Sequence, residues 1–478
     1  MKPKTNFDFV EYYQNHFSQK TKYLMKNIPK TDLEAFNASL KGSLLFPYQD
    51  GYDEARAVWN GMIDKRPAMI VRCIDKTDVI KSVKFAREND LLVSVKGGGH
   101  NVAGNAVCED GLMIDLSLMK DIKIDTKNQT VHAEAGLLWS ELDIETQKLG
   151  FATTGGTVSH TGIAGLTLGG GLGWLMGKHG LSCDNLLSVE IVLADGTLFT
   201  ANEAQNKDIF WAVRGGGGNF GIVTSFEYQL HEVGTQIIGG MILYTMDQAK
   251  EVLKFYREYA RNTPDELMVF SAIMTTPDGL PVIALIVGWF GALSEGEEHL
   301  KPLRNFGTPL ADLVAEIPYL QLQTIFDAAV PHGLHRYWKS GYLPEITDSF
   351  IEMLLEEAAK SPSPYSFILF FHIKGAAARV DSSKTAFGSR TDAWDFDIVS
   401  QWIDPAEANK NTDWVRSFFA LVEPYTQGVY VNHLDVDDGN TRVKAAYGKN
   451  YERLVAIKNQ YDPTNFFHLN NNIVPTIA

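Results

Sequence analysis

Hydrophobic and polar positions follow two different patterns along the chain. Between about residues 60 and 230, short β-branched runs at 69–73 and 91–95 enclose an amphipathic segment at 78–89. Runs of this length are typical of strands and the segment between them of a helix, so the order β–α–β is predicted. The same pattern continues with strands predicted at 111–117, 130–136 and 188–200, and a helix over 137–150. This part of the chain is therefore expected to form an α/β domain.

The second pattern, from about residue 235 to 425, consists of longer apolar runs separated by helical segments such as 247–262. Antiparallel strands backed by helices fit this arrangement best. The strand-like runs lie at 235–246, 267–276, 280–291 and 365–380. A helix is predicted over 441–461, and the chain then ends in a non-helical segment over 462–475 that Pro463 and an Asn cluster impose.

Composition and charge narrow the class of protein. A chain of 478 residues suggests two or three domains at about 150 residues each. Its 45% hydrophobic and 21% charged residues are ordinary for a folded globular protein and exclude disorder or a collagen-like repeat. The formal net charge of −15 disfavours nucleic acid and anionic membranes as the main partners.

The cysteines and the N-terminal residues indicate the cellular compartment of the protein. Cys73, Cys108 and Cys183 are too few for a disulfide framework or a CxxC metal site, although one pair stays open. No metal is expected. Residues 1–17 carry early lysines without the apolar core of a signal peptide, and no stretch approaches about 20 apolar residues. A soluble, cytoplasmic protein is the expectation.

Glycine is concentrated in three runs of the first part, at 96–101, 155–173 and 214–221. Without a Cβ, such loops approach a ligand closely and present several N–H groups to a phosphate. The dinucleotide fingerprint fails at 171–176 because Met176 stands where a small residue is needed, and no P-loop sequence occurs. A nucleotide of another binding mode is therefore favoured.

These runs, with 208–230 and the tail that begins at YVN and ends at NNNI, resemble the p-cresol methylhydroxylase/vanillyl-alcohol oxidase flavoprotein superfamily. Within it, the berberine-bridge-enzyme-like oxidases are the most similar. The resemblance extends from about residue 50 to the C-terminus, with the motifs in matching order. It implies an α+β fold in which FAD lies between two α/β subdomains, under a substrate domain with an antiparallel sheet backed by helices.

The resemblance also implies domain limits. Residues 1–232 would form the FAD-binding domain and 233–424 the substrate-binding domain, and 425–478 would return to the FAD domain. His100 matches the histidine that the family bonds to the flavin 8-methyl carbon. A neutral imidazole is a competent nucleophile near pH 7. Relatives with a second, cysteinyl bond carry that cysteine where this chain has Val158, so a single histidyl bond is expected.

The same resemblance assigns a set of residues to the cofactor. They would line the pyrophosphate, the flavin ring and the adenine side, or fix the C-terminal segment near the flavin. They are Lys96, Gly97, Gly98, Gly99, His100, Asn101, Gly104, Thr157, Thr161, Gly162, Gly165, Gly170, Gly171, Gly173, Ile222, Val223, Asn470 and Asn472.

The catalytic candidates are Tyr430, which matches the family's active-site tyrosine, and His372, on a predicted strand. A free phenol has a pKa of about 10, so a base at neutral pH needs a cation nearby or the field of the flavin. His433, three residues after Tyr430, would face away from it on a regular strand, whereas a bulge would overturn this expectation. The candidate cations are Arg336, Lys339, Lys374 and Arg379.

The expected function is an FAD-dependent oxidase that takes hydride from an alcohol, amine or sugar-like substrate and passes electrons to O2. Alternatives are a dehydrogenase with another acceptor, an NADPH-dependent reductase on a similar fold, and a noncatalytic flavin protein. Aromatic residues of the second domain, including Trp289, Phe290, Tyr337, Trp338 and Phe371, are candidate substrate contacts or core. Substrate identity and oligomeric state do not follow from the sequence.

Overall fold

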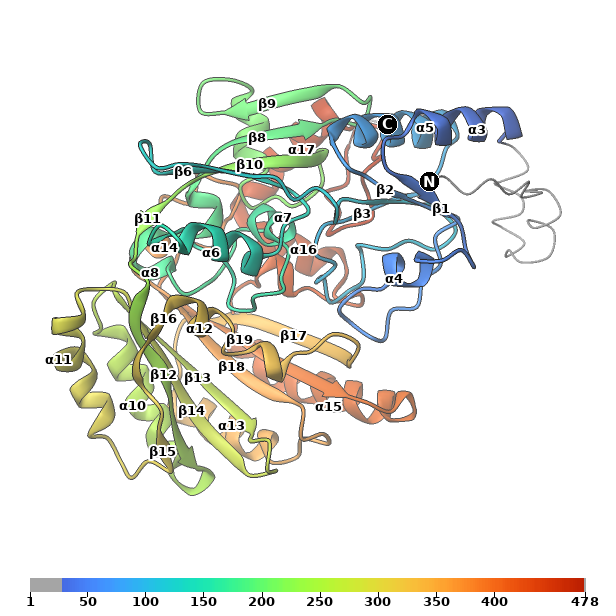
Figure 1. Ribbon diagram of the computed structural model, residues 1–478. Helices are drawn as coiled ribbons and strands as arrows, with labels where there is room; N and C mark the ends of the chain where they lie inside the picture. The colour runs from blue at the N-terminus through green and yellow to red at the C-terminus, as the bar shows by residue number, and fades with distance from the viewer. Residues whose placement is uncertain (1–27, 477–478) are drawn as a thin grey trace.

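A computed structural model describes residues 28–476 of the chain as two sheet-containing layers with a C-terminal segment beside the first (Figure 1). The predicted features of residues 1–17 lie outside the described residues. Within 28–476, no helix has both the length and the apolar character needed to cross a bilayer.

The first layer begins with a four-stranded sheet in the order β1-β2-β4-β3. The strands β2 and β3 were predicted to flank one helix, and they do, but β4 lies between them and pairs with both in parallel. Asp75 caps the helix α5 by accepting the N–H groups of Thr77 and Asp78. The elements are α3 (Lys30–Ser39), β1 (Ser43–Leu45), α4 (Tyr52–Arg56), β2 (Met69–Arg72), α5 (Lys76–Glu88), β3 (Val93–Lys96) and β4 (Leu112–Asp115).

A five-stranded antiparallel sheet follows, in the order β5-β6-β10-β8-β9. The predicted helix over 137–150 is α6, which ends at Gln147, and the chain turns at Gly150 with a φ of 73°. The elements are β5 (Ile122–Asp125), β6 (Thr130–Glu134), α6 (Trp139–Gln147), β7 (Phe151–Ala152), α7 (Ile163–Leu168), α8 (Met176–His179), β8 (Leu186–Val192), β9 (Leu198–Asn202), α9 (Lys207–Ala212), β10 (Ile222–Gln229) and β11 (His231–Glu232).

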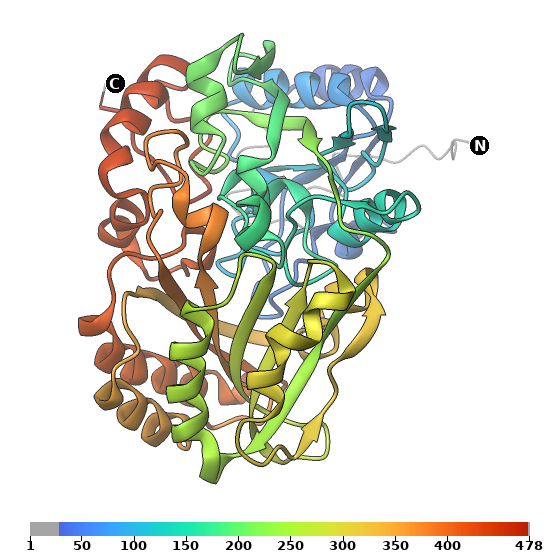
Figure 2. The same ribbon diagram turned by 90° about the vertical axis from the view of Figure 1, so that its left-hand side faces the viewer.

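The second layer is the predicted antiparallel sheet, in the order β15-β12-β14-β13-β18-β19-β17, with β16 paired to β12. Figure 2 shows the same layers turned by 90°. The elements are β12 (Gln236–Thr245), α10 (Ala249–Arg261), β13 (Leu267–Thr275), β14 (Pro281–Trp289), α11 (Leu293–Arg304), β15 (Ala311–Asp312), β16 (Ala315–Pro318), α12 (Tyr319–Gln323), β17 (His335–Leu343), α13 (Asp348–Ala358), β18 (Phe367–Ile373), α14 (Gly375–Arg379), β19 (Ala393–Trp402) and α15 (Ala408–Val422).

Both faces of this sheet are covered, which explains its continuous apolar strands. Leu267 and Val269 pack with the helices α10, α11, α13 and α15 in one core cluster. Met268 and Phe270, on the alternate positions of the same strand, belong to the core cluster that includes the first layer. The sheet is thus held between its helices and the first layer.

The C-terminal segment departs from the predicted single helix over 441–461. It forms α16 (Gly439–Tyr447) and α17 (Tyr451–Tyr461), separated by a short 3₁₀ turn from Gly448 to Asn450. Gly448 has a φ of 51°, which an α-helix does not accommodate. The predicted non-helical ending over 462–475 is confirmed. Asn219 donates to the backbone of Asn471, so the tail lies against the third glycine run.

Candidate active site

A cavity of about 1080 Å³ lies where the glycine runs, the second sheet and the C-terminal segment meet. The three glycine runs line one side of it, and side chains of β12, β13 and β18 line the other. Residues from Tyr430 to His433 and from Leu469 to Asn471 complete the lining. Segments far apart in the sequence thus converge on one space.

The first two glycine runs touch each other backbone to backbone beside this cavity. A Cβ on Gly98 would lie 2.4 Å from the backbone nitrogen of Gly162, and a Cβ on Gly162 would lie equally close to that of Gly98. Both positions therefore require glycine. Among the described residues, the N–H groups of Gly97, Gly98 and Gly99 donate no hydrogen bond. They remain available to an anionic ligand.

Most of the residues assigned to the cofactor from the sequence line the cavity. These are Gly97, Gly98, Gly99, His100, Asn101, Thr157, Thr161, Gly162, Gly165, Ile222, Val223 and Asn470, and Tyr430 lines it with them. The remaining assigned residues lie outside its lining. These are Lys96, Gly104, Gly170, Gly171, Gly173 and Asn472.

Some of the residues outside the lining have clear structural partners. The ammonium of Lys96 donates to the carbonyl oxygens of Ala55 and Ala57, at 2.6 and 2.9 Å. Gly171 donates its backbone N–H to the hydroxyl of Tyr430 at 2.9 Å. Asn471, which is not among the residues predicted to hold the cofactor, lines the cavity and donates to the carbonyl of Val431 at 2.7 Å.

His100 lies in a cluster of rings at one end of the cavity. Its imidazole stacks on Trp59 with ring centroids 4.2 Å apart, and its Nε2 lies 3.1 Å from Nδ1 of His160. Burial, followed by the charges of His160, His332 and Arg336, holds the pKa of His100 well below its usual value. The ring is therefore neutral at physiological pH, the form that acts as a nucleophile.

The cysteines do not form a pair with one another. Cys73, Cys108 and Cys183 are all free and buried. Val158, the position at which the resemblance would place a second linking cysteine, lines the cavity, whereas none of the three cysteines does.

Tyr430 is buried, at 2% exposure, and its hydroxyl lies in a defined hydrogen-bond geometry. The oxygen accepts the backbone N–H of Gly171 and the side-chain Nδ2 of Asn432, each at 2.9 Å. Two donors favour the ionised phenol, but burial outweighs them and raises the pKa of Tyr430. Because both neighbours donate, the phenol's own hydrogen is not used by either of them.

The expectation that His433 faces away from Tyr430 is wrong. Val431–His433 form a 3₁₀ turn, not a strand. In such a turn residues three apart lie on one side, so the two rings meet edge to face with centroids 4.7 Å apart. His433 also stacks on Trp338 with centroids 4.4 Å apart.

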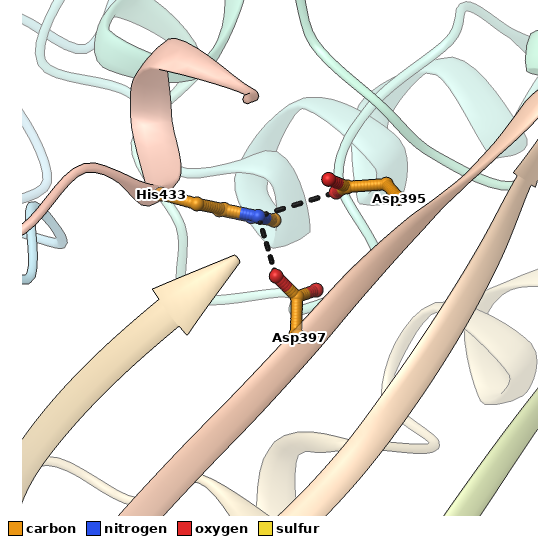
Figure 3. A group of neighbouring side chains, drawn as sticks. All are labelled: Asp395, Asp397 and His433. Carbon is orange, nitrogen blue, oxygen red and sulfur yellow. Dashed lines mark ion pairs between the residues drawn. The ribbon is translucent and has the colours of Figure 1, made fainter. Parts of the chain in front are cut away.

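Two buried carboxylates hold the ring of His433 (Figure 3). Its Nδ1 lies 2.9 Å from an oxygen of Asp397 and 3.2 Å from one of Asp395, within ion-pair distance of both. Burial alone would lower the pKa of His433, but Asp397 and Asp395 overcome this and raise it to about 10. Burial and Asp397 together raise the pKa of Asp395 to about 6.

Sequence reasoning missed this carboxylate pair. The signal was two aspartates at strand spacing, Asp395 and Asp397, in the otherwise largely apolar run of β19. Alternation puts both on one face, and there Trp338 donates its Nε1 to Asp397 at 2.8 Å.

The candidate cations do not lie beside Tyr430. Lys339 pairs with Asp437 and Asp438, and Arg379 with Asp265. Lys374 donates to backbone carbonyls that include that of Thr263. Arg336 lies over the ring of Trp59 at 3.8 Å. The cation that faces Tyr430 is instead the imidazolium of His433.

His372 lies apart from this group. Its Nε2 is 2.7 Å from Asp392, and its ring stacks on Trp394 with centroids 4.7 Å apart. It does not line the cavity. Of the aromatic candidates of the second domain, Trp338 and Phe371 line the cavity, whereas Trp289, Phe290 and Tyr337 are core residues.

Comparison with known proteins agrees with this geometry. A family model described as FAD binding domain matches residues 67–202, and one described as berberine and berberine like matches residues 429–474. The two matched segments carry the first two glycine runs and the Tyr430–His433 turn.

Individual relatives extend the similarity to nearly the whole chain. An FAD-linked oxidoreductase of Dictyostelium discoideum is 35% identical over 423 residues, which cover 87% of this chain and 91% of that protein. The (R)-6-hydroxynicotine oxidase of Paenarthrobacter nicotinovorans is 29% identical over 456 residues, covering 91% and 97%.

The fold is shared with solved structures. The crystal structure of 6-hydroxy-D-nicotine oxidase from Arthrobacter nicotinovorans matches with a TM-score of 0.83 and 28% identity, covering 91% of this chain and 98% of that one. A chitooligosaccharide oxidase matches with a TM-score of 0.82 at 21% identity, covering 93% and 99%. The chain therefore belongs to the berberine-bridge-enzyme-like family of FAD-linked oxidoreductases.

Proposed function

We propose that this FAD-dependent oxidoreductase is an oxidase: it removes hydride from an alcohol, amine or sugar-like carbon and delivers the electrons to O2, giving H2O2. The observation that carries the proposal is that the glycine runs and the Tyr430–His433 pair line the same cavity. The candidate cofactor residues and the candidate proton-transfer group therefore share one cavity.

The residues present fit FAD. Free backbone N–H groups of Gly97, Gly98 and Gly99 suit a diphosphate, and open space lies where the Cβ atoms of Gly165 and Gly218 would stand. His100 would hold the cofactor through one histidyl bond, since Val158 supplies no thiol. When bound, FAD supplies the hydride acceptor at N5.

Tyr430 would handle the proton of the substrate. Oxidising an alcohol or amine requires the O–H or N–H proton to leave as the hydride departs, and a positioned side chain must accept it. Gly171 and Asn432 hold the phenol oxygen at a fixed point on the cavity wall, through bonds of 2.9 Å each. Both bonds strengthen when the oxygen is negative, so they favour the form that accepts a proton.

His433 would act as the fixed positive charge that Tyr430 needs. Its pKa of about 10 keeps the ring protonated at neutral pH. Asp395 and Asp397 maintain that charge, and neither lines the cavity. The substrate would meet the Tyr430 and His433 side chains, while the carboxylates would hold the charge of His433. His372 would take no direct part, since it lies outside the cavity lining.

Two alternatives to an oxidase differ from it either in the electron acceptor or in having no catalytic turnover. A dehydrogenase would use the same residues with an acceptor other than O2, and a noncatalytic flavin protein would bind FAD without being reduced. The partner we infer is a small molecule, not nucleic acid or a membrane. Three free, buried cysteines suit a cytoplasmic setting.

The test is an anaerobic reduction assay of the purified holoenzyme followed by exposure to O2. We expect a substrate to bleach the flavin absorbance, and O2 to restore it with one H2O2 released per flavin. If O2 reoxidises the bleached flavin only slowly and an artificial acceptor reoxidises it at once, the protein is a dehydrogenase. Flavin that no compound bleaches would contradict both forms of the proposal.

A further inference from the structure

The second sheet presents a continuous apolar surface to the cavity. The strand register places Leu243, Ala284, Ala272 and Leu369 side by side across β12, β14, β13 and β18. Flanking rows on the same face add further apolar side chains. We call the members that line the cavity the apolar floor: Met241, Leu243, Ala272, Met274, Val282, Phe367, Leu369 and Phe371.

The apolar floor ends abruptly at the next strand. Leu369 pairs with Asp397, and Phe371 pairs with Asp395. These carboxylates hold His433, whose ring meets that of Tyr430. A molecule lying on the apolar floor would therefore have one edge against the proton-transfer group and the rest of its body against hydrocarbon.

Among the described residues, His433 is the one charged side chain in the lining. Within residues 28–476, no Asp, Glu, Lys or Arg lines the cavity. Two hydroxyls on the sheet side lie beside strand ends and are engaged elsewhere: Ser366 bonds the hydroxyl of Ser400, and Thr276 bonds Asp278. A ligand with many hydroxyls would lose its water without gaining partners on the floor.

The rim of the cavity is apolar as well. Leu313 and Tyr365 line the cavity and remain 58% and 48% exposed. Large apolar side chains held in water at an opening favour the arrival of an apolar molecule, since its entry removes their surface from water.

We propose that the substrate is an uncharged, apolar alcohol or amine, not a saccharide. This inference rests on the proposed function and narrows it. The imidazolium of His433 disfavours an ammonium beside it, so an amine would enter as its free base. The apolar body would lie on the floor, with the reacting carbon beside Tyr430.

The reaction balances without a further reagent. The substrate carbon loses its hydrogen with the bonding electron pair to FAD, and the attached O–H or N–H loses its proton to the Tyr430 oxygen in its ionised, phenolate form. The carbon–oxygen or carbon–nitrogen bond becomes double, giving a ketone, aldehyde or imine. The proposed acceptor, O2, then takes the two electrons and two protons as H2O2.

The test compares two matched panels on the oxidised holoenzyme by anaerobic stopped-flow reduction. One panel holds neutral aryl and fused-ring alcohols and cyclic amines, and the other holds mono-, di- and oligosaccharides. We expect the apolar panel to contain compounds with a reduction rate over dissociation constant about 100-fold or more above any saccharide, a difference of the size with which an apolar pocket rejects an added hydroxyl. A nonoxidisable neutral aromatic ketone should also bind and perturb the flavin spectrum.

Variants assign the preference to the apolar floor. Met241→Gln keeps the length of the side chain and adds an amide that must lose its water when an apolar substrate binds. We expect it to raise the dissociation constant about 10-fold while leaving the limiting reduction rate within about 3-fold. Met274→Gln is the second variant should the first lose its flavin. Met62→Gln, at a 38% exposed methionine outside the cavity lining, is the control.

The outcomes separate the two proposals. Saccharides that bleach the flavin as well as the best apolar compound, or a Met241→Gln enzyme that binds apolar compounds unchanged, would overturn the substrate class and leave the redox function intact. A holoenzyme that no compound of either panel bleaches would overturn the proposed function itself.

Discussion

Replacing Tyr430 by phenylalanine tests the assignment of the proton acceptor directly. The substitution removes one oxygen and keeps the buried ring, so packing against Phe387 and His433 is preserved. What changes is the pair of hydrogen bonds from Gly171 and Asn432. The variant thus isolates the chemistry of the phenol from its volume.

The loss of folding stability in Tyr430→Phe depends on whether the donors of Gly171 and Asn432 keep another acceptor. Asn432 also donates to the carbonyl of Leu166 at 3.2 Å, so its amide keeps a partner. The N–H of Gly171 has no second acceptor among the described residues, and leaving one buried donor unpaired costs about 1–3 kcal/mol. We expect the free energy of unfolding to fall by about that amount in urea unfolding followed by tryptophan fluorescence.

The cost to activity is expected to be larger. A positioned general base contributes about 10²–10⁴-fold, so the limiting rate of anaerobic flavin reduction should fall by that factor while substrate binding changes little. Tyr342→Phe is the matched control. Tyr342 is buried nearby, its hydroxyl has no partner among the described residues, and it does not line the cavity. A Tyr430→Phe enzyme that reduces its flavin as fast as the Tyr342→Phe enzyme would refute the role of the phenol.

Three further predictions address the cofactor site and the His433 charge. Gly98→Ala would place a Cβ 2.4 Å from the backbone nitrogen of Gly162, so we expect the loops to separate and the flavin content per protein to fall, as read from the absorbance ratio. His100→Ala should leave FAD extractable by acid precipitation, whereas colour retained in the pellet of that variant would contradict the single histidyl bond. Because the folded pKa of His433 is about 10, above its unfolded value near 6.5, its protonated ring stabilises the fold fully below pH ~6.5 and that stability is lost as the pH rises toward 10. His433→Gln should flatten the dependence of the unfolding free energy on pH over that window, and an unchanged slope would show that the ring carries no such charge.

That the glycine runs line a ligand cavity was predictable from the sequence, because each run is a local feature whose composition has one main physical use. The helix α5 and the strands that flank it were predictable for the same reason, since capping by Asp75 and apolar periodicity are properties of a short window. The position of β4 between those strands was not predictable from the sequence, because strand order depends on contacts between distant segments.

The His433 site shows where such prediction fails. Strand alternation was applied to the segment from Tyr430, but the chain turns there, and a single 3₁₀ turn reverses which side chains share a face. The partners of His433 lie on β19, over thirty residues earlier, so no local window contains them. The search for a cation was justified by the chemistry of a phenol, but it covered lysines and arginines and omitted a histidine charged by its neighbours.

The acidic pair also bears on how the second sheet fixes its register. Every residue of β18 between Ile368 and Ile373 is buried, so hydrophobicity alone does not say which of its faces should meet the cavity. A slip of one residue would exchange the faces of β19 and turn Phe396 and Ile398 to the cavity side in place of Asp395 and Asp397. The carboxylates would then be buried among the helices, away from His433 and from the Trp338 donor, at a large desolvation cost. The charges that serve the proposed chemistry therefore also select the register that builds the apolar floor.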